Sequence, residues 1–274
     1  MDWGMQNRLS RILQPDDERT VMLAVDHGYF LGPMTSLEQP ALTIEPLIDH
    51  ADALMLTRGI VRTSVDPRTH TPIVLRVSGG VSIAGEALEN EGLVTSIEDA
   101  MRLSACAVAL QLFVGTPYER QTILNLGQLV NEGERVGMPV LAVTAVGREL
   151  EKREARYLAL CCRIAAETGA RLVKTYYCDG FEKVAGGCPV PVIIAGGPKM
   201  DTELDVFQVT YDALQAGAAG VDMGRNIWQH ETPVPMITAI RAIVHDNADP
   251  YEALDIFRRS RDEEEARERV LQGG

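Results

Sequence analysis

Short runs of apolar residues, rich in β-branched side chains, recur along the whole chain. Apolarity within each run is continuous rather than alternating, which is typical of strands that are covered on both faces, as they are in parallel sheets. The eight runs lie at residues 20–25, 53–56, 73–77, 108–114, 140–144, 172–175, 190–195 and 220–223. We therefore expect eight buried, parallel strands.

The segments between these runs carry helix signals. Residues 155–168 are rich in helix formers with recurrent apolar positions, as expected of an amphipathic helix. The segment 95–98, Thr-Ser-Ile-Glu, matches a capping box that opens a helix. Either Asp201 or Thr202 is a suitable N-cap for the helix that follows the seventh run. Strands and helices are therefore expected to alternate.

This alternation predicts the fold class, an α/β protein of the (β/α)8 TIM barrel type. No internal linker is evident, so residues 1–274 are expected to form a single domain. An extra helix at residues 3–13 would close the bottom of the barrel, and the charged segment 258–269 would be a solvated C-terminal helix. The alternative is an open, doubly wound sheet, but no G-x-G-x-x-G motif follows the first run.

Composition and charge disfavour several classes of protein and of binding partner. Of the 274 residues, 46% are hydrophobic, which is enough for a large core and excludes disorder as the main feature. The net charge of -13 disfavours nucleic acid or an anionic membrane surface as a partner, because both attract positive charge. No apolar run approaches the roughly 20 residues that span a bilayer, and residues 1–4 lack the features of a signal peptide. We expect a cytoplasmic protein.

The five cysteines indicate neither a disulfide framework nor a metal site. Their number is odd and no C-x-x-C pair occurs, so we predict reduced thiols and no zinc ribbon. Cys106, Cys161 and Cys162 lie in apolar segments and are expected in the core. Cys178 follows the sixth run and is a weak candidate nucleophile, because no activating base can be placed beside it.

Lysine is scarce, and one lysine occupies a special position. None occurs in the first 151 residues, and Lys174 ends the sixth apolar run. An amine placed where a buried strand meets a loop can lose its proton and attack a carbonyl, so Lys174 is the candidate nucleophile. The alternative is a structural barrel lysine in a chain that prefers arginine. Lys152 and Lys183 lie in charged segments and are weaker candidates.

In a barrel of this type, the catalytic groups follow the carboxyl ends of the strands. Asp26 and His27 follow the first run and supply a carboxylate and an imidazole, the usual groups for proton transfer. Opposite a reactive lysine, Asp26 could stabilise an iminium ion and His27 could move a proton, although either could be structural. Arg58, after the second run, suits a phosphate or an enolate, but a salt bridge is an equally good interpretation.

Two glycine-containing segments follow the seventh and eighth runs. Gly196 and Gly197 form the first, and Gly224 with Arg225 forms the second. Flexible backbone amides beside a bidentate cation suit a phosphate dianion, and barrels often bind phosphate after strands seven and eight. The glycines could instead only make tight turns. Lys199, two residues beyond the first pair, could reach the same phosphate or remain solvated.

Four segments together resemble the archaeal-type class I aldolases, a family of barrel enzymes that form a Schiff base. They are Asp26-His27-Gly28, Val173-Lys174-Thr175, Ala195-Gly196-Gly197 and Gly224-Arg225-Asn226. The resemblance covers nearly the whole chain. It implies that Lys174 is the Schiff-base lysine, that Asp26 is the strand-one aspartate of the aldolases, and that the two glycine segments with Arg225 bind phosphate.

Longer segments resemble a thiolase branch of this family, which degrades the phosphorylated form of autoinducer-2, a quorum-sensing signal. They lie at residues 2–12, 21–30, 174–177 and 220–226. That likeness implies a phosphorylated diketone as substrate and coenzyme A as co-substrate, with no bound cofactor. The implied products are dihydroxyacetone phosphate and acetyl-coenzyme A. Family members form ring-based homo-oligomers, so we expect one here.

Two departures from the family pattern bear on the activity. Aldolases of the fructose-bisphosphate type carry a tyrosine acid on strand five, where residues 143–147 read Val-Thr-Ala-Val-Gly. Acyl transfer to coenzyme A tolerates this absence, because no aldehyde is released. Pro198 stands before Lys199 where the thiolase branch has another lysine, so the role of that loop is open. The alternatives are a class I aldolase or aldolase-like synthase acting on a sugar phosphate or sulfosugar phosphate and, from another class, a noncatalytic phosphosugar sensor.

Overall fold

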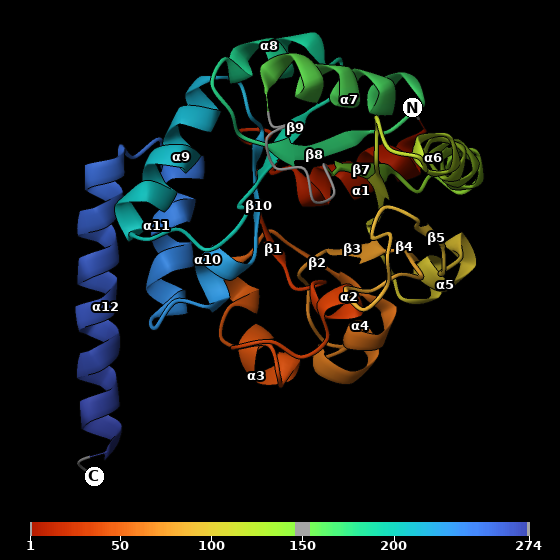
Figure 1. Ribbon diagram of the computed structural model, residues 1–274. Coiled ribbons are helices and arrows are strands. Elements are labelled where there is room, and N and C mark those ends of the chain that lie inside the picture. Colours follow the sequence, from red (N-terminus) through yellow and green to blue (C-terminus); the bar gives the residue numbers. More distant parts are fainter. Residues whose placement is uncertain (1, 146–153, 273–274) are drawn as a thin grey trace.

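Eight parallel strands close into a barrel in the computed structural model, which describes residues 2–145 and 154–272 (Figure 1). The strands follow one another around the barrel in chain order, and the last pairs with the first. They are β1 (Thr20–Ala24), β2 (Ala53–Thr57), β3 (Ile73–Arg76), β6 (Ala107–Leu112), β7 (Val140–Thr144), β8 (Leu172–Tyr176), β9 (Val192–Ala195) and β10 (Gly220–Met223). The predicted (β/α)8 fold is confirmed, and the strand bounds agree with the predicted runs to within two residues.

Helices surround the barrel and connect successive strands (Figure 1). They are α1 (Trp3–Ile12), α2 (Gly28–Leu31), α3 (Pro40–Ile44), η1 (Ile48–His50, a short 3-10 helix), α4 (Arg58–Ser64), α5 (Ile97–Arg102), α6 (Glu119–Glu134), α7 (Ala155–Glu167), α8 (Phe181–Gly187), α9 (Glu203–Gln215), α10 (Arg225–Trp228), α11 (Pro233–Asp246) and α12 (Pro250–Gln272). A small antiparallel pair, β4 (Ser78–Gly79) and β5 (Gly92–Leu93), lies in the connection between β3 and α5.

Successive residues of each barrel strand point to opposite faces of the sheet, and the two faces carry different hydrophobic clusters. On β8, Val173 belongs to the layer between barrel and helices, whereas Leu172 belongs to the cluster that fills the barrel interior. On β1, Met22 belongs to the interior cluster. Continued alternation points Lys174 and Asp26 inward as well. The strand pattern therefore directs both candidate catalytic side chains into the barrel.

The N-terminal helix closes the bottom of the barrel, as predicted. α1 begins after its N-cap, Asp2, and ends at Ile12. Ile12 is fully buried and belongs to the same interior cluster as Met22 and Leu172. The end of the barrel at which the strands begin is therefore filled by side chains, and an accessible site must lie at the other end.

Helix starts agree with the predictions except in one case. Thr202 rather than Asp201 caps α9, in a capping box with Asp205. The N-cap of α5 is Ser96 rather than Thr95, so the predicted box was one residue early. The reason is that the Ser96 hydroxyl is the group that faces the first turn of the helix and accepts a hydrogen bond from a backbone amide there.

The C-terminal helix α12 extends past the rest of the molecule toward the chain end (Figure 1). Its first turns pack on α9 and α11 through Ala253 and Phe257, whereas most of residues 258–269 are exposed. The predicted solvated helix is confirmed. Within residues 2–145 and 154–272, no helix has the length and apolarity that crossing a membrane requires.

Candidate active site

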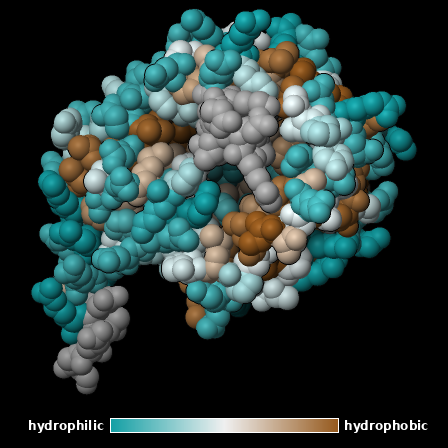
Figure 2. Space-filling model, viewed as in Figure 1, coloured by the Kyte–Doolittle hydropathy of each residue, from teal (hydrophilic) through white to brown (hydrophobic). Residues whose placement is uncertain are grey.

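A pocket opens at the end of the barrel where the strands finish, and every barrel strand contributes a residue to its wall. We call it the barrel pocket. Its volume is about 130 Å³, well below the roughly 300–1,000 Å³ of pockets for drug-sized ligands. The surface is hollowed near the middle of the face shown in Figure 2. A pocket of this size suits a small substrate.

Lys174 lies in the barrel pocket and pairs with a carboxylate to which the sequence had given no role. Lys174 Nζ lies 2.8 Å from Asp222 Oδ2, and the two side chains are 9% and 0% exposed. Asp222 reaches the interior because its neighbours on β10, Val221 and Met223, point to the outer layer. The signal available in the sequence was a lone carboxylate inside the last apolar run.

The buried position of Asp222 changes the pKa of its carboxyl group. Burial raises its pKa to about 6, although the nearby charge of Lys174 acts in the opposite direction. Among the described residues, none donates a hydrogen bond of ordinary geometry to either oxygen of this carboxyl, so the ion pair is its main stabilisation. A carboxylate whose pKa lies near neutrality can accept a proton from the amine that it contacts. Asp222 is therefore placed to accept a proton from the amine of Lys174.

Asp26 lies close to this pair and is held by a buried arginine. Arg76 Nη1 lies 3.2 Å from Asp26 Oδ2, and Arg76 Nη2 lies 2.9 Å from Glu91 Oε2. The Tyr29 hydroxyl accepts a hydrogen bond from Arg76 and donates one to Glu91. Both Arg76 and Glu91 are buried, and together they fix the orientation of Asp26. A carboxylate fixed in this way can stabilise positive charge that develops on a nearby amine.

The sequence indicated no role for Arg76 or Glu91. Arg76 lies inside the third apolar run, so its inward position could have been inferred from the strand pattern. Glu91 lies outside the barrel strands, just before β5, and only the fold of the β3 to α5 connection brings it to Arg76. No local pattern distinguishes Glu91 from the other acidic residues nearby.

His27 lines the barrel pocket in its neutral form. Burial lowers its pKa to about 4, and Lys174 and Arg225 act in the same direction, while Asp26 opposes them. The imidazole packs edge-on against Trp228, with ring centroids 5.5 Å apart. Its Nδ1 lies 3.8 Å from Asp26 Oδ1. A neutral imidazole can donate its ring N–H to a bound substrate, but with this pKa it is a weak base at neutral pH.

The two glycine segments after β9 and β10 lie side by side in the wall of the barrel pocket. Arg225 Nη2 donates a hydrogen bond to the Gly197 carbonyl oxygen at 2.9 Å. Asn226 Nδ2 donates one to the Gly196 carbonyl oxygen at 2.8 Å. These bonds join the two segments into one wall that carries a guanidinium group, as a phosphate site requires. Asn226 was quoted in the family resemblance but had been given no role.

Gly224 also has a packing role that is independent of any phosphate. A Cβ atom at this position would lie 2.5 Å from the Ala24 carbonyl oxygen and 2.7 Å from His27 Cε1. It would also lie 2.9 Å from Nε1 of Trp228, which donates a hydrogen bond to the same carbonyl oxygen. The glycine is therefore required for close packing at this strand end. This packing role does not conflict with a role of the same segment in phosphate binding.

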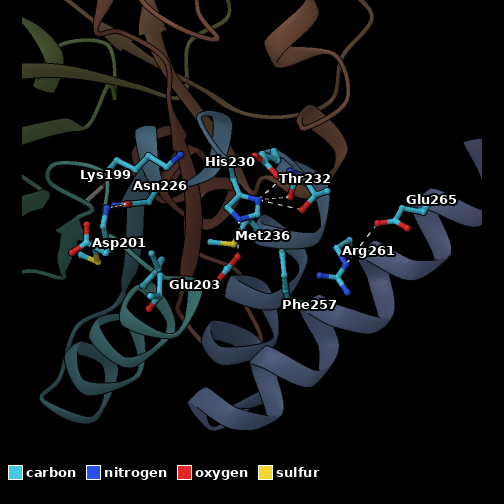
Figure 3. A pocket seen from close by; sticks show the side chains of 14 residues that line it. Lys199, Asp201, Glu203, Asn226, His230, Thr232, Met236, Phe257, Arg261 and Glu265 are labelled. Carbon is cyan, nitrogen blue, oxygen red and sulfur yellow. Dashed lines mark hydrogen bonds and ion pairs between the residues drawn. The ribbon is translucent and has the colours of Figure 1, made fainter.

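Arg58 and Lys199 do not line the barrel pocket. Arg58 Nη1 lies 2.9 Å from Asp99 Oδ2 on α5, and its side chain is 45% exposed, so the salt-bridge interpretation is the one that the geometry supports. Lys199 Nζ donates a hydrogen bond to the Gln229 carbonyl oxygen at 2.7 Å. Lys199 lines a second pocket, bounded by α9, α11 and α12, which we call the lateral pocket (Figure 3). Neither residue is placed to bind a substrate at Lys174.

The end of β7 carries apolar and hydroxyl side chains rather than a phenol. Val143, Thr144 and Ala145 line the barrel pocket. The phenol in the wall belongs instead to Tyr176, two residues after Lys174 on β8. Residues 146–153, which include Lys152, lie outside the described residues.

None of the five cysteines lines the barrel pocket. Cys106, Cys161 and Cys162 are buried, as predicted. Cys178 does not line the barrel pocket, and burial raises the pKa of its thiol, which is the opposite of what a nucleophilic cysteine needs. Across the part of the chain that the structure describes, no group of three or more His, Cys, Asp or Glu side chains could hold a metal ion.

Comparison with known proteins identifies the family. Residues 20–230 match the family described as DeoC/LacD family aldolase. A 3-hydroxy-5-phosphonooxypentane-2,4-dione thiolase of Photorhabdus laumondii is 54% identical, over 94% of this chain and 88% of its own. A thiolase of the same name from Yersinia enterocolitica is 52% identical over the same shares.

Solved structures agree with this assignment. An archaeal fructose-1,6-bisphosphate aldolase, whose catalytic lysine is covalently bound to the carbinolamine intermediate of its substrate, superposes with a TM-score of 0.80. It is 25% identical and covers 88% of this chain and 99% of its own. The chain belongs to the DeoC/LacD aldolase family, as the resemblance seen in the sequence had implied.

Proposed function

We propose that this enzyme of the class I aldolase superfamily is a 3-hydroxy-5-phosphonooxypentane-2,4-dione thiolase that uses coenzyme A as co-substrate. The observation that carries the proposal is the Lys174–Asp222 pair, 2.8 Å apart, in one small pocket with the two glycine segments and Arg225. The relatives of this name support the choice of substrate, because they match 94% of the chain.

The first step forms a Schiff base. Asp222 takes the proton of Lys174, and the neutral Nζ attacks the C4 carbonyl carbon of the diketone, with loss of water. C4 is chosen because cleavage of the C2–C3 bond leaves an electron pair on C3, and an iminium at the neighbouring C4 accepts that pair. Asp26, held by Arg76, faces this developing positive charge and stabilises it.

The second step transfers the acetyl group. The thiol of coenzyme A loses its proton and adds to the C2 carbonyl carbon, and the adduct collapses with cleavage of the C2–C3 bond. The acetyl group leaves as acetyl-coenzyme A, and the enamine that remains takes a proton at C3. Water then hydrolyses the iminium and returns free Lys174 and dihydroxyacetone phosphate. The thiol proton balances the proton gained at C3, and His27, which lines the barrel pocket, is the candidate carrier of this proton.

The phosphate end of the substrate binds the wall formed by Gly196, Gly197, Gly224 and Arg225. Arg225 supplies positive charge, and its bond to Gly197 keeps the guanidinium group at the pocket. Binding energy from this remote group orients the carbonyl toward Lys174. Arg58 and Lys199 have no part in this proposal.

The test is turnover of the phosphorylated diketone with and without coenzyme A. We expect acetyl-coenzyme A and dihydroxyacetone phosphate, in equal amounts, only when coenzyme A is present. Product formation from the diketone that does not depend on coenzyme A would contradict the thiolase assignment.

A class I aldolase that cleaves a sugar phosphate is the second candidate. The observation in its favour is Tyr176, which brings a phenol to the pocket although β7 has none among its described residues. Release of an aldehyde from a sugar phosphate, abolished by Tyr176→Phe, would support it. Tight phosphosugar binding with no turnover would instead indicate a noncatalytic sensor.

The cellular setting and the assembly are also proposals. We place the enzyme in the cytoplasm, in the breakdown of a phosphorylated quorum-sensing signal, as a ring-based homo-oligomer. The family resemblance supports all three statements. Light scattering coupled to size-exclusion chromatography measures the assembly directly, and a monomer would contradict it.

A further inference from the structure

A second cavity of about 130 Å³ adjoins the barrel pocket. We call it the side channel. The two cavities share four wall residues, Phe30, Gln111, Ala145 and Tyr176. Because the same four side chains line both, the two cavities lie next to each other.

The walls of the side channel are mainly apolar or aromatic. Phe30 comes from α2, Val81 and Leu88 from the connection between β4 and β5, and Phe113 from the segment just after β6. Its one carboxylate, Glu91, is neutralised by Arg76 at 2.9 Å and accepts a hydrogen bond from the Ser78 hydroxyl at 2.6 Å. The channel therefore suits a slender, uncharged chain rather than a phosphate.

The position of the side channel matches one end of the proposed substrate. Around the barrel, β3 lies opposite β9 and β6 lies opposite β10, so the side channel and the glycine segments face each other across the pocket. A substrate with its phosphate at the glycine segments therefore directs its acetyl end toward Gln111 and Tyr176. Tyr176 lies two residues beyond Lys174 on β8, a separation of about 7 Å along a strand.

We propose that the side channel admits the thiol-bearing pantetheine arm of coenzyme A to the acetyl end of the bound diketone. This inference rests on the proposed thiolase function and adds to it the entry path of the second substrate. Val81 and Leu88 line the side channel but not the barrel pocket, and both are half-buried, so larger side chains at these positions would narrow the channel.

The lateral pocket is the other large cavity near the glycine segments, and its charges disfavour this ligand. Four carboxylates line it, from Asp201, Glu203, Glu231 and Glu265, against the two cations Lys199 and Arg261 (Figure 3). Glu203 is already engaged with His230 at 3.1 Å. Excess negative charge repels the phosphates of coenzyme A.

The test uses variants that narrow the side channel, and the KM of each substrate is measured separately. We expect Val81→Trp to raise the KM for coenzyme A by about tenfold or more, and to leave the KM for the diketone and borohydride trapping at Lys174 unchanged. Leu88→Trp should behave in the same way. The matched control is Val65→Trp, because Val65 is also a half-buried valine that lines a cavity, but one remote from the barrel pocket. Free pantetheine, which lacks the nucleotide, should show the same KM change as coenzyme A.

The outcomes separate this inference from the function on which it rests. If the unmodified protein shows no turnover that depends on coenzyme A, the proposed function fails and the inference fails with it. If turnover depends on coenzyme A but both tryptophan variants keep the original KM for it, only the side channel is wrong. A KM change for coenzyme A that is absent with pantetheine would also contradict entry of the arm through this channel.

Discussion

Nζ of Lys174 and Oδ2 of Asp222 lie 2.8 Å apart in the wall of the barrel pocket, and both side chains are almost completely buried. The amine and its proton acceptor therefore come from different strands, β8 and β10. Neither residue alone explains the chemistry, because a buried ammonium cannot attack and a buried carboxylate needs a partner.

Replacement of Lys174 should abolish catalysis. We expect Lys174→Met to reduce kcat by more than about 1,000-fold, since loss of a nucleophile removes the covalent route. Borohydride reduction in the presence of substrate, followed by peptide mass spectrometry, should label the unmodified protein at Lys174 alone. Lys183→Met, an exposed position on α8, is the control and should keep full activity. A label on any other lysine would refute the mechanism.

Asp222 should determine the acidic limb of the pH profile. Its pKa is raised to about 6 by burial, so the carboxylate that accepts the Lys174 proton is lost as the pH falls through that value. We expect kcat to fall as the pH falls through about 6. Asp222→Asn should reduce kcat by about 100-fold to 10,000-fold, and this acidic fall in kcat should be absent from the variant. The measurement is kcat against pH for both proteins. An unchanged acidic limb in the variant would show that another group titrates.

Arg225 should contribute to binding through the phosphate alone. We expect Arg225→Gln to raise the KM for the phosphorylated diketone by about 10-fold to 100-fold, the effect of losing one charged hydrogen-bonding group. The dephosphorylated diketone should bind both proteins equally weakly. Lys199→Gln removes the same charge from the lateral pocket and should leave this KM unchanged. A larger effect of the Lys199 change would move the phosphate site to the lateral pocket.

A side chain at position 224 should destabilise the strand end. A Cβ atom there meets the Ala24 carbonyl oxygen at 2.5 Å, so Gly224→Ala should lower the free energy of unfolding by about 1–3 kcal/mol. Urea denaturation measures the change. At Gly59, an added Cβ atom meets nothing within 4 Å, and Gly59→Ala, in helix α4, should be neutral or stabilising. Equal effects at the two positions would contradict the packing argument.

His245, in the last turn of α11, should make the free energy of unfolding depend on pH. Burial by itself lowers the pKa of His245, but hydrogen bonds to Asp52 at 2.8 Å and to Asp17 at 2.7 Å outweigh it and raise the pKa above 6.5. The folded state therefore binds the proton more tightly. Its contribution to stability is complete below the unfolded value and is lost as the pH rises through the folded value.

Comparison with a variant isolates this contribution. The difference in unfolding free energy between the unmodified protein and His245→Gln should be about 1–2 kcal/mol larger at about pH 6 than at about pH 9. His70→Gln, at an exposed position, serves as the control and should show no such difference. A difference for His245→Gln that does not change with pH would contradict the assignment.

The sequence by itself determined the architecture and the main candidate groups. Continuous apolar runs predict buried parallel strands because only such strands are covered on both faces. Their positions were correct to within two residues, and the strand ends pointed to Lys174, Asp26, His27 and the glycine segments, all of which line one pocket. Strand positions and the residues that follow each strand depend on short stretches of sequence, so they can be predicted from the sequence alone.

Only the tertiary structure decided which groups meet. Asp222 pairs with Lys174 because closure of the barrel brings the inward faces of β8 and β10 together, and Glu91 reaches Arg76 through an irregular connection. Arg58 and Lys199 also follow strands, yet they point to Asp99 and Gln229 instead. Side-chain direction beyond a strand end depends on loop conformation and on partners distant in the chain, and periodicity carries no information about either.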